Sequence, residues 1–254
     1  MDLIQISEAA HLFTAQRQAQ EIFGCFDIWW RGHSKSEWKL VPAIYRPEAR
    51  NKYKRRLVDH DTTLEVHSYC NFMQNAPLRA ANCPRMGDYL GWLFLMQHHG
   101  ILTRLLYWSM SVLVASHFAV NEYQGESPGT LCALKPFELN RRGFGDKANV
   151  VFSPEQRELI EIAKPGFKPG SDPVQKIAAM IPTQVDARML VQLSRFTIHG
   201  YEVPLDHLPE SDKFLLKFAI PANSKKRVFV ELENVGIRTM NLFPDLDHLA
   251  EDII

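Results

Sequence analysis

The stretch Ile28-Trp29-Trp30-Arg31-Gly32-His33 joins an apolar, aromatic-rich run to an arginine and a glycine. Aromatic and β-branched residues favour strands, so we expect a short buried strand over residues 26–30. The end of that strand would carry Arg31 out of the core, and Gly32 would let the backbone pass close to a ligand. The planar guanidinium of Arg31 suits a phosphate or a carboxylate. The structural alternative is a strand-end arginine paired with a carboxylate, followed by a glycine turn.

A second stretch, residues 97–109, crowds polar groups into an otherwise apolar segment. Each of them needs a partner if buried, and core packing alone does not require so many. Gly100 would end a helix over residues 88–96, and Thr103 and Arg104 would follow in a loop or strand that leads towards a shared cleft. Ser109 would cap a second helix that continues to residue 120, and a helix N-terminus also favours an anion.

Further side chains have both a functional and a structural interpretation. His98 and His99 are adjacent, so on a helix they point about 100° apart and do not form the one-faced pair of a metal site. We expect one histidine to pack and the other to bond to a backbone carbonyl. Gln192 lies among apolar residues before an expected strand over residues 195–198, where a buried amide could pin a neighbouring loop. Aromatic rings could also stack on a flat ligand, although most of these residues are expected in the core: Trp29, Trp30, Trp38, Tyr107 and Trp108.

The composition indicates an ordinary soluble protein with one mixed α+β domain over residues 1–254. Hydrophobic residues make up 46% and charged residues 23% of the 254 residues. The 29 basic residues balance the 29 acidic ones, which does not favour long-range attraction to nucleic acid or to an anionic membrane. Four cysteines form no CxxC pair, so we expect reduced thiols in the cytoplasm and no zinc ribbon.

Signals along the chain place further elements. No signal peptide is expected at the N-terminus, and polar residues interrupt the most apolar segment before it is long enough to cross a membrane. Ser7 would cap a first helix that ends at Gly24. Further strands are expected over residues 129–134 and 214–220, and helical patterns over residues 52–72 and 242–253. Residues 225–236 fit a helix or a strand equally, and the basic run at residues 52–56 fits a solvated helix face.

The glycine- and proline-rich residues 139–173 indicate loops around at most one helix, near residues 154–163. No GxGxxG, GxxxxGK[ST], GxSxG or HExxH motif is present. Nucleotide binding by a Rossmann or P-loop route is therefore not expected.

Taken together, the motifs resemble the FRG domain family, which is named for a Phe-Arg-Gly motif. Trp30 replaces the phenylalanine, and Arg31 and Gly32 are retained. Residues 97–109 resemble the family's Gln-His-x-Gly-x-x-Thr-Arg-Leu-Leu-Asp-Trp-Thr, with Tyr107 in place of Asp and Ser109 in place of Thr. Shorter similarities lie at residues 40–46 (Leu-x-Pro-x-x-x-Arg), 115–119 (Ala-x-x-Phe-Ala), 188–196 (Arg-x-x-x-Gln-x-x-x-Phe) and 242–246 (Leu-Phe-Pro-Asp-Leu). The resemblance covers residues 20–252, nearly the whole chain.

The order of these motifs is also similar to that of ADP-ribosyltransferases, which implies a split sheet with flanking helices. By this resemblance Arg31 would hold the phosphates of NAD, and the Gly32 backbone would bond to the nicotinamide amide. Tyr107 would stack on the nicotinamide, and Thr103 or Ser109 would hold the middle strand. The late motif falls at residues 192–194. The implied catalytic residues are Arg31, Thr103, Ser109 and Gln192, and the implied NAD-binding residues are Arg31, Gly32, His98, Arg104 and Tyr107.

Many transferases carry Gln-x-Glu at the late motif, and the glutamate is missing here. It orients the ribose hydroxyl and stabilises the developing oxocarbenium ion. We therefore expect the activity to be weak, to use another acid such as Glu202 or Glu231, or to be absent.

The leading hypothesis is an ADP-ribosyltransferase-like enzyme that cleaves NAD, uses no metal, and modifies a protein or nucleic acid as a toxin or antiphage effector. The alternative is a non-catalytic nucleotide- or protein-binding module that uses the same cleft. A third hypothesis is a nuclease or other hydrolase that uses His98 or His99 with Arg104. It is weaker, because no carboxylate cluster that could bind a metal accompanies these residues.

Overall fold

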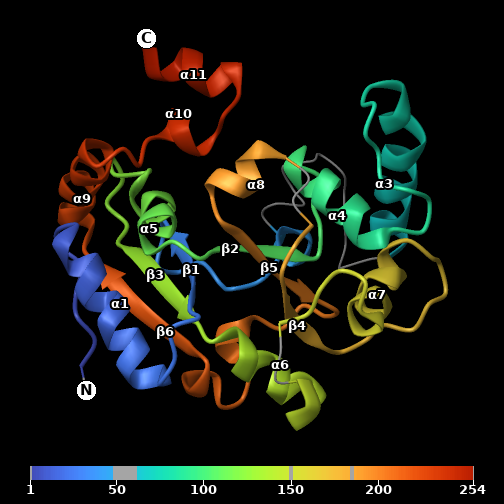
Figure 1. Ribbon diagram of the computed structural model, residues 1–254, viewed down its shortest axis with the longest axis horizontal. Helices are drawn as coiled ribbons and strands as arrows, with labels where there is room; N and C mark the ends of the chain where they lie inside the picture. The colour runs from blue at the N-terminus through green and yellow to red at the C-terminus, as the bar shows by residue number, and fades with distance from the viewer. Residues whose placement is uncertain (1, 48–61, 149–150, 184–185, 254) are drawn as a thin grey trace.

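One antiparallel sheet of six strands, in the order β4-β5-β2-β1-β3-β6, organises the molecule, and helices surround it (Figure 1). The computed structural model describes residues 2–47, 62–148, 151–183 and 186–253. The expected mixture of helices and sheet is confirmed. The strands are β1 (Trp29–His33), β2 (Leu105–Ser109), β3 (Gly129–Leu134), β4 (Ile177–Met180), β5 (Ser194–His199) and β6 (Leu215–Ile220).

The helices gather in two groups, one beside β1, β3 and β6 and the other beside β2, β4 and β5 (Figure 1). The first group contains α1 (Ala10–Phe23), α5 (Val112–Val120) and α9 (Ala222–Asn234). The second contains α3 (Thr62–Asn75), α4 (Tyr89–His98) and α7 (Arg157–Ala163). The remaining helices are α6 (Pro136–Phe144), α8 (Ala187–Val191), α10 (Thr239–Leu242) and α11 (Leu246–Ile253). Within the described ranges, no helix combines the length and apolar character that crossing a membrane requires.

The sheet opens between its two central strands. β1 pairs with β3 along its whole length, from Trp29 to His33, and β2 pairs with β5 along its whole length. β1 and β2, in contrast, are registered only at Trp30 and Ser109. The two strands therefore stop pairing beyond this point, next to Arg31 and Gly32.

Gly32 lets helix α5 lie directly on β1. A Cβ at this position would lie 2.0 Å from the Ala115 carbonyl oxygen and 2.5 Å from the Ala119 nitrogen. The close approach is between two pieces of the same domain, so packing alone requires the glycine. Arg31 and Gly32 lie inside a strand that extends to His33, and the expected strand end at residue 30 is wrong. Pairing with β3 carries the strand further than its apolar run.

Ser109 does not cap a helix, because it is the last residue of β2. The N-cap of α5 is Ser111, whose Oγ accepts a hydrogen bond of 3.3 Å from the Val114 nitrogen. A short apolar run such as residues 105–109 does not by itself distinguish a buried strand from a helix. Ser7 is also not a cap: the N-cap of α1 is Ala9.

Other expectations about the elements had mixed outcomes. Gly24, with φ 62°, ends α1, and Asp88 caps α4 through a hydrogen bond of 2.9 Å from the Gly91 nitrogen. The strands expected over residues 129–134, 195–198 and 214–220 are confirmed as β3, β5 and β6, and residues 225–236 lie mostly in helix α9. Strand β4 and helix α6, which begins with a proline, were not expected. The basic run at residues 52–56 lies outside the described residues.

Candidate functional site

A cavity of about 290 Å³ lies where β1 and β2 separate beneath α5. We call it the Arg31 cavity. Its walls are formed by Trp30, Arg31, Gly32, Ser34, Trp38, Tyr107, Ala115, Phe118, Asn121 and Glu122. A second space of about 500 Å³, the adjoining hollow, shares Ser34, Asn121 and Glu122 with it and is also lined by Lys35, Tyr123, Gln124, Gly125, Ser127 and Lys225.

The guanidinium of Arg31 bridges the opening in the sheet. Its Nη1 donates a hydrogen bond of 2.8 Å to the Tyr107 carbonyl on β2, and its Nε donates one of 2.9 Å to His33 Nε2 on β1. If the register of the two strands continued, Gly32 would stand opposite Tyr107, but the strands do not pair there. The side chain of Arg31 thus replaces a main-chain donor and holds the two strands apart at a fixed distance.

Arg31 carries a positive charge that no acidic side chain neutralises within the described residues. Both of its hydrogen-bond partners, a carbonyl and an imidazole nitrogen, are neutral acceptors. Burial, assisted by the positive charge of Arg46, lowers the pKa of Arg31 to about 9. The side chain stays protonated at neutral pH, and an anion in the cavity would relieve this unfavourable electrostatic environment.

The two histidines near Arg31 are neutral. Burial, followed by the charges of Arg31 and Arg46, lowers the pKa of His33 to about 2 and that of His199 to about 3. His33 Nε2 accepts a hydrogen bond from Arg31, and His199 Nε2 lies 2.9 Å from Thr197 Oγ1. The positive charge around the cavity therefore belongs to the arginines.

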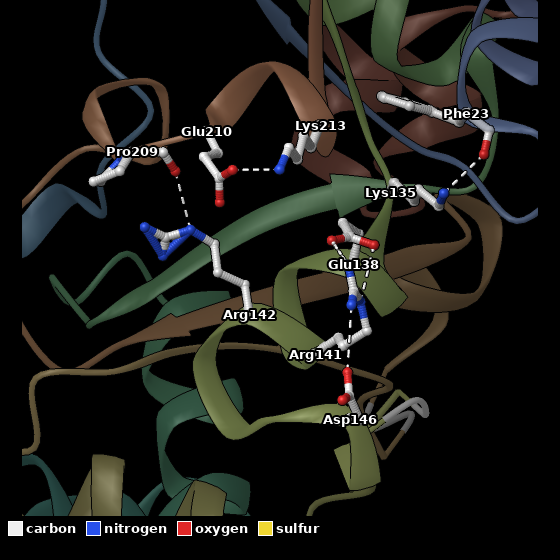
Figure 2. Close-up of polar contacts among 9 residues, drawn as sticks. All are labelled: Phe23, Lys135, Glu138, Arg141, Arg142, Asp146, Pro209, Glu210 and Lys213. Carbon is white, nitrogen blue, oxygen red and sulfur yellow. Dashed lines mark hydrogen bonds and ion pairs between the residues drawn. The ribbon is translucent and has the colours of Figure 1, made fainter.

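The charged cluster around α6 provides a contrast (Figure 2). Figure 2 shows Arg141 paired with Glu138 and Asp146, and Lys213 paired with Glu210. Arg142 donates a hydrogen bond of 3.0 Å to the Pro209 carbonyl. Two of the three cations that line the hollow of about 280 Å³ between these groups, Arg141 and Lys213, are thus paired with carboxylates. This hollow offers an anion much less than the Arg31 cavity does.

Three predicted residues form a connected network beside the cavity. Tyr107 Oη donates a hydrogen bond of 3.1 Å to the Gln192 carbonyl, and Ser109 Oγ donates one of 2.7 Å to the same oxygen. Gln192 Nε2 donates to the Leu242 carbonyl at 2.8 Å, so its amide ties the end of β2 to the C-terminal segment. Burial raises the pKa of Tyr107 to about 12. Tyr107 lines the cavity, whereas Ser109 and Gln192 do not. The Gln192 carbonyl holds the Tyr107 side chain in place through its hydrogen bond.

The first, middle and late motifs lie in one row across adjacent strands. Trp30 pairs with Ser109, and Ser109 pairs with Ser194. Leu193, between Gln192 and Ser194, is half-exposed and has φ 50°, in the left-handed region that non-glycine residues rarely adopt. Segments far apart in the sequence are therefore neighbours at the place where the sheet opens.

Arg104, Thr103 and His98 do not line the Arg31 cavity. Arg104 forms a buried, bidentate ion pair with Glu65, with distances of 2.7 Å from Nε and 2.5 Å from Nη2. Burial alone would lower the pKa of Arg104, but the Glu65 carboxylate more than offsets it and raises that pKa. Thr103 Oγ1 bonds to Gln97 and accepts a hydrogen bond from the Leu105 nitrogen at 3.2 Å. His98 Nδ1 lies 2.9 Å from Asp186 Oδ2.

Comparison with known families adds one finding to this geometry. Residues 27–127 match the FRG domain. No curated protein and no solved structure matches the chain. All residues that line the Arg31 cavity fall within the FRG match, as do both central strands.

Several residues of the FRG match that line the cavity were missed by sequence reasoning. Phe118 belongs to a motif that was noted, but its helical spacing favours packing. Asn121 and Glu122 directly follow the apolar helix α5. Two polar residues at the end of an apolar helix were the sequence signal that could have indicated their position at the cavity. Trp38 was not missed: it is one of the aromatic residues that the sequence analysis considered for stacking, and it lines the cavity from a loop. In the parts of the chain that the structure describes, no three His, Cys, Asp or Glu side chains gather to hold a metal ion.

Neither of the two acids that were named as substitutes for the missing glutamate, Glu202 and Glu231, lines the Arg31 cavity. Glu231 Oε2 accepts a hydrogen bond of 2.6 Å from the Ala9 nitrogen, and its Oε1 accepts one of 2.9 Å from Arg227. Glu202 is exposed in the loop that follows β5.

Proposed function

We propose that the Arg31 cavity binds the nicotinamide half of NAD and that the protein is an ADP-ribosyltransferase-like enzyme. The observation that carries this proposal is the Arg31 guanidinium, which faces neutral partners in a cavity with aromatic walls. A diphosphate would supply the missing negative charge. The rings of Trp38, Tyr107 and Phe118 would pack against the cationic nicotinamide ring.

The size of the two spaces supports the same proposal. The Arg31 cavity, at about 290 Å³, suits one mononucleotide half, and the adjoining hollow, at about 500 Å³, offers room for the rest of the ligand or for an acceptor. The side chains of Arg31 and Tyr107 are held by hydrogen bonds before any ligand binds. Binding would then require little reorganisation of the protein.

The reaction breaks the bond between C1′ of the ribose and the nicotinamide nitrogen. The bonding electrons go to that nitrogen, and neutral nicotinamide leaves. A nucleophile on a protein or nucleic acid bonds to C1′ and loses its proton. Arg31 would hold the diphosphate so that the ribose stays in place, and the aromatic walls would exclude water. Action as a toxin or antiphage effector in the cytoplasm belongs to this proposal.

A second candidate is a module that binds a nucleotide or a protein in the same cavity without chemistry. One observation favours it. Ser194 occupies the place of the late glutamate, and its neighbours in the row are Ser109 and Trp30 rather than an acid.

Calorimetric titration of NAD, together with detection of released nicotinamide, separates these candidates. Arg31→Gln should weaken NAD binding by at least about tenfold, because it removes a charge-assisted hydrogen bond. Arg142→Gln, which changes a cation outside the cavity, should leave binding unchanged. Nicotinamide release that depends on Arg31 supports the enzyme. Binding without release supports the binding module, and an absence of NAD binding contradicts NAD as the ligand of either candidate.

A further inference from the structure

Within the described residues, Glu122 is the one acidic residue among those that line the Arg31 cavity. It follows α5, which ends at Val120, and comes directly after the C-cap Asn121. Glu122 also lines the adjoining hollow, so it stands at the boundary between the two spaces. A residue at this boundary is close both to a ligand in the cavity and to a molecule that approaches from the hollow.

The backbone at Glu122 is anchored, while its side chain is exposed to solvent. The buried ammonium of Lys225 donates a hydrogen bond of 2.8 Å to the Glu122 carbonyl and one of 2.9 Å to the Ser34 carbonyl. This cross-link fixes the end of α5 against the end of β1. The Glu122 side chain is exposed and, among the residues that the structure describes, forms no hydrogen bond or ion pair. Its negative charge acts on Lys225, where it partly offsets the burial that lowers the pKa of that ammonium. The carboxylate oxygens therefore remain accessible to a ligand.

We propose that Glu122 is the catalytic carboxylate that takes the place of the glutamate missing from the late motif. This inference rests on the proposed function. The late motif carries Ser194 at the expected place, and Glu231 is bonded to Ala9 and Arg227 on another surface. Glu122 lines the same cavity as Arg31, because α5 packs directly on β1 at Gly32.

The carboxylate would act in two steps on the bound dinucleotide. As the C1′–N bond breaks and its electron pair leaves with nicotinamide, the ribose becomes an oxocarbenium ion, which the negative charge stabilises. The nucleophile, which enters from the adjoining hollow, then bonds to C1′. Its proton passes to the Glu122 carboxylate and from there to solvent. When water is the nucleophile, the products are nicotinamide, ADP-ribose and one proton.

The test compares Glu122→Gln with Glu126→Gln in the full-length protein. Glu126 is an exposed glutamate of the same turn that lines neither the Arg31 cavity nor the adjoining hollow. In Glu122→Gln we expect kcat for nicotinamide release to fall about 100-fold or more, because a general base is lost. The dissociation constant of NAD should change by less than about threefold, since the amide keeps the shape of the side chain. Glu126→Gln should match the wild type.

A conservative substitution identifies the role further. Glu122→Asp keeps a carboxylate at this position and should retain a kcat between those of Glu122→Gln and the wild type. Urea unfolding of both variants, with midpoints equal to that of the wild type, shows that the fold is intact. If Glu122→Gln releases nicotinamide at the wild-type rate, the assignment of Glu122 is overturned and the proposed enzyme stands. If the wild type releases no nicotinamide, both are overturned.

Discussion

Arg31, in β1, and Arg104, which directly precedes β2, have guanidinium groups in different electrostatic environments. Arg104 is neutralised by Glu65 in a bidentate ion pair, as burial of a charge normally requires. Arg31 faces only the His33 ring and a carbonyl, and its pKa is lowered to about 9. A cation kept without a counter-charge is unfavourable for stability, which fits a group reserved for an anionic ligand.

At the residue scale, Gly32→Ala tests whether packing alone requires the glycine. The added methyl would meet the Ala115 carbonyl at 2.0 Å, so α5 must move away from β1. We expect the free energy of unfolding to fall by about 1–3 kcal/mol, measured by urea denaturation. Gly125→Ala is the matched control, because its nearest neighbour would be 3.7 Å away and the substitution should be nearly neutral. Equal stability of both variants would contradict the packing account.

His117 predicts a dependence of stability on pH. Burial lowers its pKa from 6.5 to about 4, so the unfolded chain binds this proton more readily than the folded one. Stability should therefore fall as pH drops below 6.5, by about 1.4 kcal/mol per pH unit from this group, and the loss should level off near pH 4. Urea unfolding at several pH values measures the slope. His117→Gln should show a smaller slope than the wild type, and an identical slope would contradict this origin.

At the scale of elements, the ion pair of Arg104 and Glu65 joins β2 to α3 inside the core. Tyr69 Oη donates a further hydrogen bond of 2.9 Å to Glu65 Oε1, and Arg104 Nη1 donates to the Ile162 carbonyl at 2.8 Å. The same guanidinium therefore also contacts α7. This network explains why Arg104 does not line the Arg31 cavity. Its side chain instead links the sheet to the helices α3 and α7.

Removal of one partner of this pair should cost more than removal of both. Arg104→Met removes the bidentate ion pair of the buried Glu65 carboxylate and should lower the free energy of unfolding by about 3–5 kcal/mol. Glu65→Leu combined with Arg104→Met removes both charges and should restore part of that loss. Urea denaturation of the two single variants and the double variant measures the coupling. Additive losses would mean that the ion pair does not connect the two elements.

At the scale of the whole molecule, the FRG match and the folded unit differ in extent. The match ends at residue 127 and contains β1 and β2, which pair with each other only at Trp30 and Ser109. Their full-length partners, β3 and β5, lie further along the chain. A sheet with two central strands and no outer strands cannot bury its faces.

A chain that ends at residue 127 should therefore not fold on its own. We expect it to show no cooperative urea transition and no dispersed amide signals in NMR spectra, while the full-length chain shows both. A cooperative transition in the shortened chain would mean that the matched segment is an autonomous domain.

The sequence predicted those elements whose signals are local. β3 and β6 are apolar runs that end at clear boundaries, and Asp88 and Gly24 mark helix ends. The end of β1 was misplaced, because its length depends on pairing with β3, and Ser109 was misassigned, because a short apolar run fits a strand or a helix. Of the candidate site, Arg31, Gly32 and Tyr107 were predicted and do line one cavity. Glu122 was not predicted, because it lines the same cavity as Arg31 only through the packing of α5 on β1.

The most direct test of the central claim is a crystal structure of the protein with ADP-ribose. The account predicts that the diphosphate lies within hydrogen-bond distance of the Arg31 guanidinium, in the opening between β1 and β2, with a ribose near Glu122. Arg31→Gln crystals soaked under the same conditions should lack the ligand. A ligand bound elsewhere, or a diphosphate that does not contact Arg31, would contradict the account.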